Sequence, residues 1–118
     1  MMTVANLAVG AIALLHVYIL VLEMFLWDKP AGRRAFDLTK EFASASRALA
    51  ANLGLYNGFL AAGLVWGLSL GQNGMDVKVF FLCCVFVAGL FGAATASRKI
   101  LFVQAFPAAI ALVLLYLA

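Results

Sequence analysis

Residues 4–22 read VANLAVGAIALLHVYILVL and contain no charged side chain. A membrane-spanning α-helix needs about 20 mostly apolar residues, so this run with its neighbours is long enough to cross a bilayer. The whole chain has 118 residues, of which 67% are hydrophobic and 11% charged. Soluble chains are nearer half apolar and a quarter charged. The sequence therefore predicts an integral membrane protein whose solvent is the lipid bilayer.

Three more apolar runs follow, and short polar turns separate all four. Asp28, Lys29 and Pro30 break the first run, and Thr39 is expected to cap the start of the second helix, whose first turns lie at the membrane interface. The fold class is therefore all-α, with four transmembrane helices in an antiparallel bundle. We predict a single domain, residues 1–118, with helices at about 4–27, 40–70, 76–97 and 99–118.

The basic residues predict the orientation, because Lys and Arg in short loops stay on the cytoplasmic side. Seven of the eight flank the first and third turns: Lys29, Arg33, Arg34, Lys40, Arg47, Arg98 and Lys99. Only Lys78 lies on the other side. We expect a multi-pass protein of the bacterial inner (cytoplasmic) membrane with both termini on the periplasmic side.

The net charge of +3 does not indicate nucleic-acid binding, because the basic residues sit at helix ends and form no continuous face. Cys83 and Cys84 are adjacent within an apolar run, so they cannot form a disulfide framework, and their role stays open. With His16 they would make a weak metal-ligand set that lacks any spacing signature. We predict no metal site, and the sequence leaves the cofactor unknown.

Small residues recur every four positions on the second and third predicted helices. The sets are Ala50, Gly54, Gly58 and Ala62, then Gly63 and Gly67, then Ala88, Gly92 and Ala96, and finally Gly89 and Ala93. Such faces let membrane helices approach closely. They suit either packing within one chain, the favoured interpretation, or a homo-oligomer formed through the glycine-rich faces.

Two ionisable residues lie inside the first predicted span. His16 and Glu23 are seven residues apart, so they lie within about 20° of one helix face but about 10 Å apart along the axis, too far for a direct hydrogen bond. A carboxylate at the bilayer centre costs at least about 2.5–3.5 kcal/mol. Glu23 therefore needs a partner, a ligand or a proton.

Counting 1.5 Å per residue from the cytoplasmic helix ends places several polar side chains at similar depths. Asn52 and Tyr56 share one face of the second helix, while Asn57 points about 100° away from Tyr56. We predict a cytoplasm-facing pocket for a small molecule or ion. Its candidate ligand-binding residues are His16, Glu23, Asn52, Tyr56, Asn57 and Gln104. The alternative is that these groups only hydrogen-bond one another between helices.

The segments LEMFLW at 22–27 and ANLGLYNGFLAAGL at 51–64 resemble those of the domain-of-unknown-function family numbered thirteen hundred and four. This family consists of small bacterial inner-membrane proteins, and the resemblance extends over essentially the whole chain. It implies four membrane helices and no particular activity. Leu53 departs from the glutamine expected there. If that glutamine contributes to a site in the family, the resemblance implies a less polar site in this chain.

Three functions fit these observations. The first is binding or transport of a small solute or ion, with Glu23 as the protonatable carboxylate and His16 as its deeper partner. The second is a membrane enzyme that acts on a lipid-soluble substrate and uses His16 or Glu23 as acid or base. The third is a structural subunit of a membrane complex. We place binding or transport first.

Overall fold

The computed structural model describes residues 1–118 and is all-helical, without strands. It divides into two compact units. The central unit is Leu14–Ala61, and the terminal unit combines Met1–Ala13 with Ala62–Ala118. The elements are α1 Met2–Met24, α2 Pro30–Phe36, α3 Lys40–Ala45, α4 Arg47–Ser69, the 3₁₀ helix η1 Gly71–Gly74, α5 Met75–Thr95, the π-helix η2 Leu101–Ala105 and α6 Phe106–Leu117.

Three segments are long and apolar enough to cross a membrane: Met2–Met24, Arg47–Ser69 and Gly71–Thr95. The fourth apolar segment, Leu101–Leu117, is shorter. Its 17 residues lie at the lower limit for a span, which is about 17 residues. The three long segments are those of a membrane protein, whereas a bundle of four spans stays a prediction.

The first predicted helix ends three residues early, at Met24 rather than Trp27. The N–H groups of Phe25 and Leu26 both donate to the carbonyl of Val21, so the α-helical pattern stops there. Trp27 instead donates its indole N–H to the hydroxyl of Ser46 at 3.0 Å. This side-chain bond fixes the chain reversal that follows α1 within the central unit.

The polar turn after α1 contains a short helix, α2, that the sequence analysis did not predict. The sequence predicts Pro30 only as a residue that ends the first helix. Pro30 occupies the first turn of α2, where its missing N–H costs nothing. A Cβ at Gly32 would collide with the carbonyl of Leu26, so only glycine allows α2 to lie against the turn. Asp37 ends the helix in the left-handed conformation, with φ of 56°.

The predicted second helix is divided at Ser46 into α3 and α4. Thr39 caps α3 as expected, because its hydroxyl accepts the N–H of Phe42 at 3.1 Å. The hydroxyl of Ser46 donates to the carbonyl of Phe42 at 2.6 Å. Serine competes with helical hydrogen bonding in this way, which explains why a helix predicted as continuous from residue 40 breaks there.

Within the central unit, α1 and α4 approach each other closely and run antiparallel. A Cβ added at Gly54 would lie 2.6 Å from the Cγ of Met24, and one at Gly58 would lie 2.6 Å from the Cδ1 of Leu20. The predicted small-residue face is correct at Ala50 and Gly54, which are buried.

Farther along α4, however, that predicted face drifts away from the interior. The buried position is Ala61, whereas the predicted Ala62 is exposed. A step of four residues advances 40° beyond a full turn, so a strict four-residue repeat rotates off any face. The buried residues of α4 therefore leave the four-residue repeat after Gly54 and continue at Ala61, Leu64 and Gly67.

Within the terminal unit, α4 turns back into α5 through η1. Gly71 adopts a positive φ of 61°, which glycine tolerates without strain. Gly74 packs on the carbonyl of Gly67, leaving no room for a side chain. The ring of Phe81 lies against Gly63. The glycines thus bring the end of α4 and the start of α5 into backbone contact.

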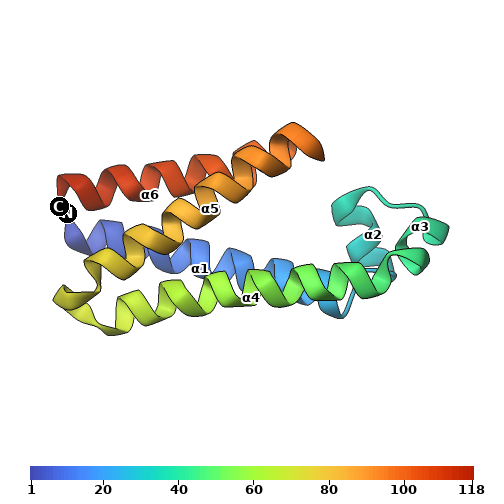
Figure 1. Ribbon diagram of the computed structural model, residues 1–118, viewed down its shortest axis with the longest axis horizontal. Coiled ribbons are helices and arrows are strands. Elements are labelled where there is room, and N and C mark those ends of the chain that lie inside the picture. The colour runs from blue at the N-terminus through green and yellow to red at the C-terminus, as the bar shows by residue number, and fades with distance from the viewer. The chain divides into compact units, whose positions relative to one another are not determined.

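α6 runs alongside α5 in this unit (Figure 1), and the two are joined by the irregular segment that contains η2. Gly89 of α5 packs on the backbone of Ala105, 2.5 Å from an added Cβ to the nitrogen. In η2 the N–H of Phe106 donates to the carbonyl of Leu101, five residues back. Pro107 follows, and since it has no N–H to donate, it favours such a widened turn.

The glycine faces are therefore occupied by contacts inside the chain. Gly54 and Gly58 contact α1, Gly67 contacts α5, and Gly89 and Gly92 contact residues of the segment that leads into α6. These contacts favour packing within one chain over a seam between chains. A homo-oligomer formed through the same faces stays a prediction.

We expect Gly89→Ala to destabilise the protein by about 1–3 kcal/mol, because the new methyl group would meet backbone atoms that cannot move independently. Gly10→Ala is the matched control, since nothing lies within 4 Å of its added Cβ. It should be neutral or stabilise by up to about 1 kcal/mol, the helix preference of alanine over glycine. Unfolding by SDS in mixed micelles measures both. Equal stabilities of the two variants would contradict the packing described for Gly89.

Candidate functional site

Glu23 lies in the last turn of α1 and is only 8% exposed. Its Oε1 accepts a hydrogen bond of 2.7 Å from the side-chain amide of Asn57. The same amide nitrogen donates to the carbonyl of Leu53 in its own helix at 3.1 Å. The carboxylate is therefore held by a neutral amide that is itself fixed to α4.

Gly54 makes this contact geometrically feasible. A Cβ at position 54 would lie 3.1 Å from the Cβ of Glu23, so a larger residue would push α4 away from α1. Asn57 follows one turn later on the same side of α4. Gly54 thus allows a small separation between α1 and α4, and at this separation the side chain of Asn57 reaches the carboxylate of Glu23.

The three polar residues predicted on α4 differ in their surroundings. Asn52 is exposed, and its amide donates to the carbonyl of Ala48 in its own helix at 2.9 Å. Tyr56 is 54% exposed and lies with its ring 6.2 Å from that of Phe59. Of the three polar residues predicted on this helix, only Asn57 is brought to Glu23, and this follows from the rotation that places Gly54 against α1.

The remaining predicted residues are His16 and Gln104. His16 is fully buried in the central unit, with 0% exposure. Gln104 is half-buried in η2 of the terminal unit. Arg47, near the start of α4, pairs with Asp28 at 3.8 Å. That ion pair is largely exposed and is worth about 0–1 kcal/mol.

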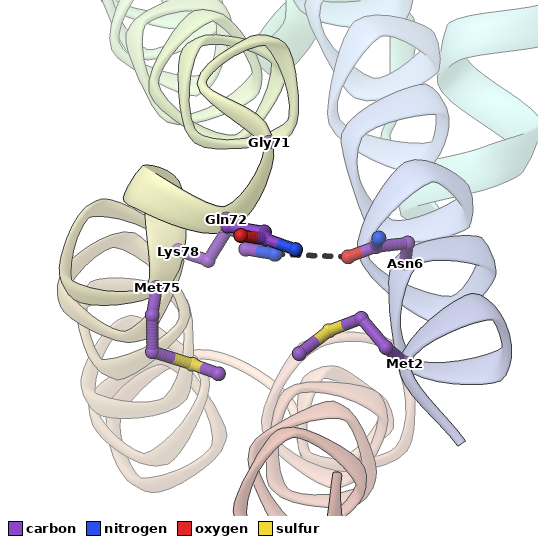
Figure 2. Close-up of a pocket in the computed structure, with 6 residues that line it drawn as sticks. All are labelled: Met2, Asn6, Gly71, Gln72, Met75 and Lys78. Carbon is purple, nitrogen blue, oxygen red and sulfur yellow. Dashed lines mark hydrogen bonds between the residues drawn. The ribbon is translucent and has the colours of Figure 1, made fainter.

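A second buried charge was not predicted as part of any site. Lys78 of α5 is 2% exposed, and its ammonium group donates to the side-chain carbonyl of Asn6 at 2.9 Å (Figure 2). The sequence analysis used Lys78 only to assign orientation. Asn6 and Lys78 lie at similar distances from the starts of α1 and α5. That similarity in depth is the sequence signal that could have indicated the pair.

The cysteines are unpaired thiols, with Cys83 exposed and Cys84 half-buried. Over residues 1–118, no three His, Cys, Asp or Glu side chains gather where they could hold a metal ion. The polar chemistry described here therefore centres on the Glu23–Asn57 pair and the Lys78–Asn6 pair.

These features define a class: a helical membrane protein with isolated buried charges, each hydrogen-bonded to an asparagine. The family described as "Protein of unknown function (DUF1304)" matches residues 10–116, and the chain belongs to this family. It is the family that the motifs of α1 and α4 resemble.

A relative from Lactococcus lactis subsp. lactis (strain IL1403), "Uncharacterized protein YpaA", is 29% identical over 104 residues. The match covers 86% of this chain and 87% of the relative. No solved structure matches.

We expect Asn57→Ala to destabilise the protein by about 1–3 kcal/mol, because it removes the hydrogen-bond donor of a buried carboxylate. Asn52→Ala is the control, since its amide bonds only its own helix on an exposed face. It should change stability by less than about 0.5 kcal/mol. SDS unfolding of both variants, completed to a double-mutant cycle of Asn57→Ala with Glu23→Ala, measures the coupling between the two side chains. A coupling of zero would contradict the pair.

Proposed function

We propose that the protein spans the bacterial cytoplasmic membrane four times and binds or transports a small cation or protonated solute at Glu23. Both termini lie on the non-cytoplasmic side in this proposal. Three long apolar helices and a shorter fourth segment support the membrane location. The clustering of basic residues between α1 and α4 and after α5 supports the orientation.

The proposal rests on one observation: the buried carboxylate of Glu23 has a neutral hydrogen-bond partner. Glu23 is 8% exposed, and the hydrogen bond that holds it comes from the amide of Asn57. An amide orients a carboxylate but does not neutralise it. A buried carboxylate without neutralisation is unstable by several kcal/mol, so it favours the uptake of a proton or a cation.

The position of Glu23 suits access from the cytoplasm. It lies at the end of α1, directly before the turn that leads into α2. Under the proposed orientation this turn faces the cytoplasm. His16, two helical turns deeper and fully buried, would then be the second group that a proton or solute meets.

The enzyme and the structural subunit remain the alternatives. An enzyme would need a substrate-sized cavity next to His16 or Glu23. Product formation from a lipid-soluble substrate by purified protein would favour the enzyme. Dependence of stability on a second membrane protein would favour the subunit.

We expect Glu23→Gln to fold but to lose ligand-coupled proton movement, because glutamine keeps the shape and hydrogen bonding of the carboxyl group without its charge. The protein is reconstituted into liposomes that contain a pH-sensitive dye. Guanidinium, tetraethylammonium and spermidine are then added in turn, and the wild-type protein should release protons on addition of at least one of them.

Asn52→Ala is the matched control and should respond like the wild-type protein. If Glu23→Gln fails to fold in detergent, Glu23 serves the structure and the site proposal is wrong. Proton release by Glu23→Gln equal to that of wild type would also overturn it.

A further inference from the structure

The start of α5 carries a buried ammonium group that the proposed function does not use. Lys78 lies in the first turns of α5 and is 2% exposed. Its stem is fixed by α4, since a Cβ at Gly67 would lie 2.6 Å from the Cγ of Lys78. The close packing at Gly67 therefore restrains the side chain of Lys78.

The ammonium group is only partly satisfied. It has three N–H donors and no acceptor, and it makes one hydrogen bond, to Asn6. It takes no part in an ion pair, because the one salt bridge described joins Arg47 and Asp28. A buried charge with a single neutral partner keeps most of its desolvation penalty.

A cavity of about 200 Å³ opens next to this group. Its lining combines two thioethers, two amides, a glycine and the ammonium group: Met2, Asn6, Gly71, Gln72, Met75 and Lys78 (Figure 2). At about 30 Å³ per water in the liquid, it has room for a small polyatomic ion. Sites for drug-sized molecules are larger, about 300–1,000 Å³.

Two long helices begin at this cavity. Met2 is the first residue of α1 and Met75 the first of α5, and no side chain caps the start of α5. A helix start carries a positive partial charge, which favours anions. At α5 the helix continues directly from η1. Asp76 in the first turn of α5 is exposed and does not line the cavity.

We infer that this cavity is a binding site for a phosphate-bearing anion, with Lys78 as the main contact. The ammonium group supplies a point charge with two unused donors, the amide of Gln72 can donate a further bond, and Asn6 orients the lysine. The ligand is either free phosphate or the phosphate of an anionic lipid headgroup. The site is separate from Glu23 and does not depend on the proposed function.

The experiment uses the full chain purified in dodecyl maltoside, which contains no phosphate. In one arm inorganic phosphate is titrated and the melting temperature is recorded, because a ligand that binds the folded state raises it. In the other arm phosphatidylglycerol is added to the micelles and the bound lipid is counted by native mass spectrometry. Both arms are run on wild type, Lys78→Met, Lys78→Arg and Lys40→Met, the last being an exposed lysine control.

Wild type, Lys78→Arg and Lys40→Met should bind, and Lys78→Met should bind at least about tenfold more weakly, the loss expected for one charge-assisted hydrogen bond. Binding only in the phosphate arm identifies a free anion, and binding only in the lipid arm a headgroup. No binding in either arm, or equal binding by Lys78→Met, overturns the inference.

If Lys78→Met does not fold, Met75→Glu decides. It places a carboxylate in the cavity lining while Lys78 and Asn6 stay in place, so it should abolish binding in both arms. Unchanged binding by Met75→Glu overturns the inference.

Discussion

The close approach of α4 to its neighbours is the constraint on which the rest of the structure depends. Lipid tails are as apolar as leucine, so burial of apolar surface does not bring membrane helices together, and close backbone packing has to do so. Gly54 provides this packing against α1 in the central unit, and Gly67 provides it against α5 in the terminal unit. In each unit the same glycine also lies against the stem of a buried charged residue, Glu23 or Lys78. Packing and polar chemistry are therefore specified together.

Each of these charged groups has an asparagine as its partner, and the amide acts as donor in one pair and as acceptor in the other. Asn57 donates its N–H to Glu23, whereas Asn6 accepts from Lys78 with its carbonyl. A hydrogen bond between side chains adds only about 0.6 kcal/mol on average in membrane proteins. The desolvation of a buried ion costs several kcal/mol. The amide therefore orients the charge without compensating it, and a ligand of opposite charge is the natural compensation.

The long apolar spans could be predicted from the sequence because composition alone determines them, and the Thr39 cap follows from a local rule that the structure obeys. The break at Ser46 was not predicted because serine tolerates a helix interior as well as a break, and its hydroxyl here bonds the carbonyl of Phe42. The helix at Pro30 could not be predicted, because it lies against the carbonyl of Leu26, a contact that forms only in the fold. The partner of Glu23 depends on the rotation of α4 about its axis. Rotating α4 about its axis by less than half a turn brings Asn57 to Glu23 in place of Asn52. The depth of a residue, counted along a helix, does not reveal this rotation.

The placement of both charges argues against a purely structural role for them. A helix has a positive partial charge at its start and a negative one at its end, worth about 0.3–1 kcal/mol to a well-placed ion. Glu23 lies in the last turn of α1 and Lys78 near the start of α5, so each charge sits at the unfavourable end of its helix. Charged residues that served only to hold the helices together would stabilise the protein more with the acidic residue at a helix start and the basic residue at a helix end. The positive partial charge at the helix starts disfavours the ammonium group of Lys78 but attracts an anion. An anion bound there is therefore attracted by the ammonium group and by the helix starts.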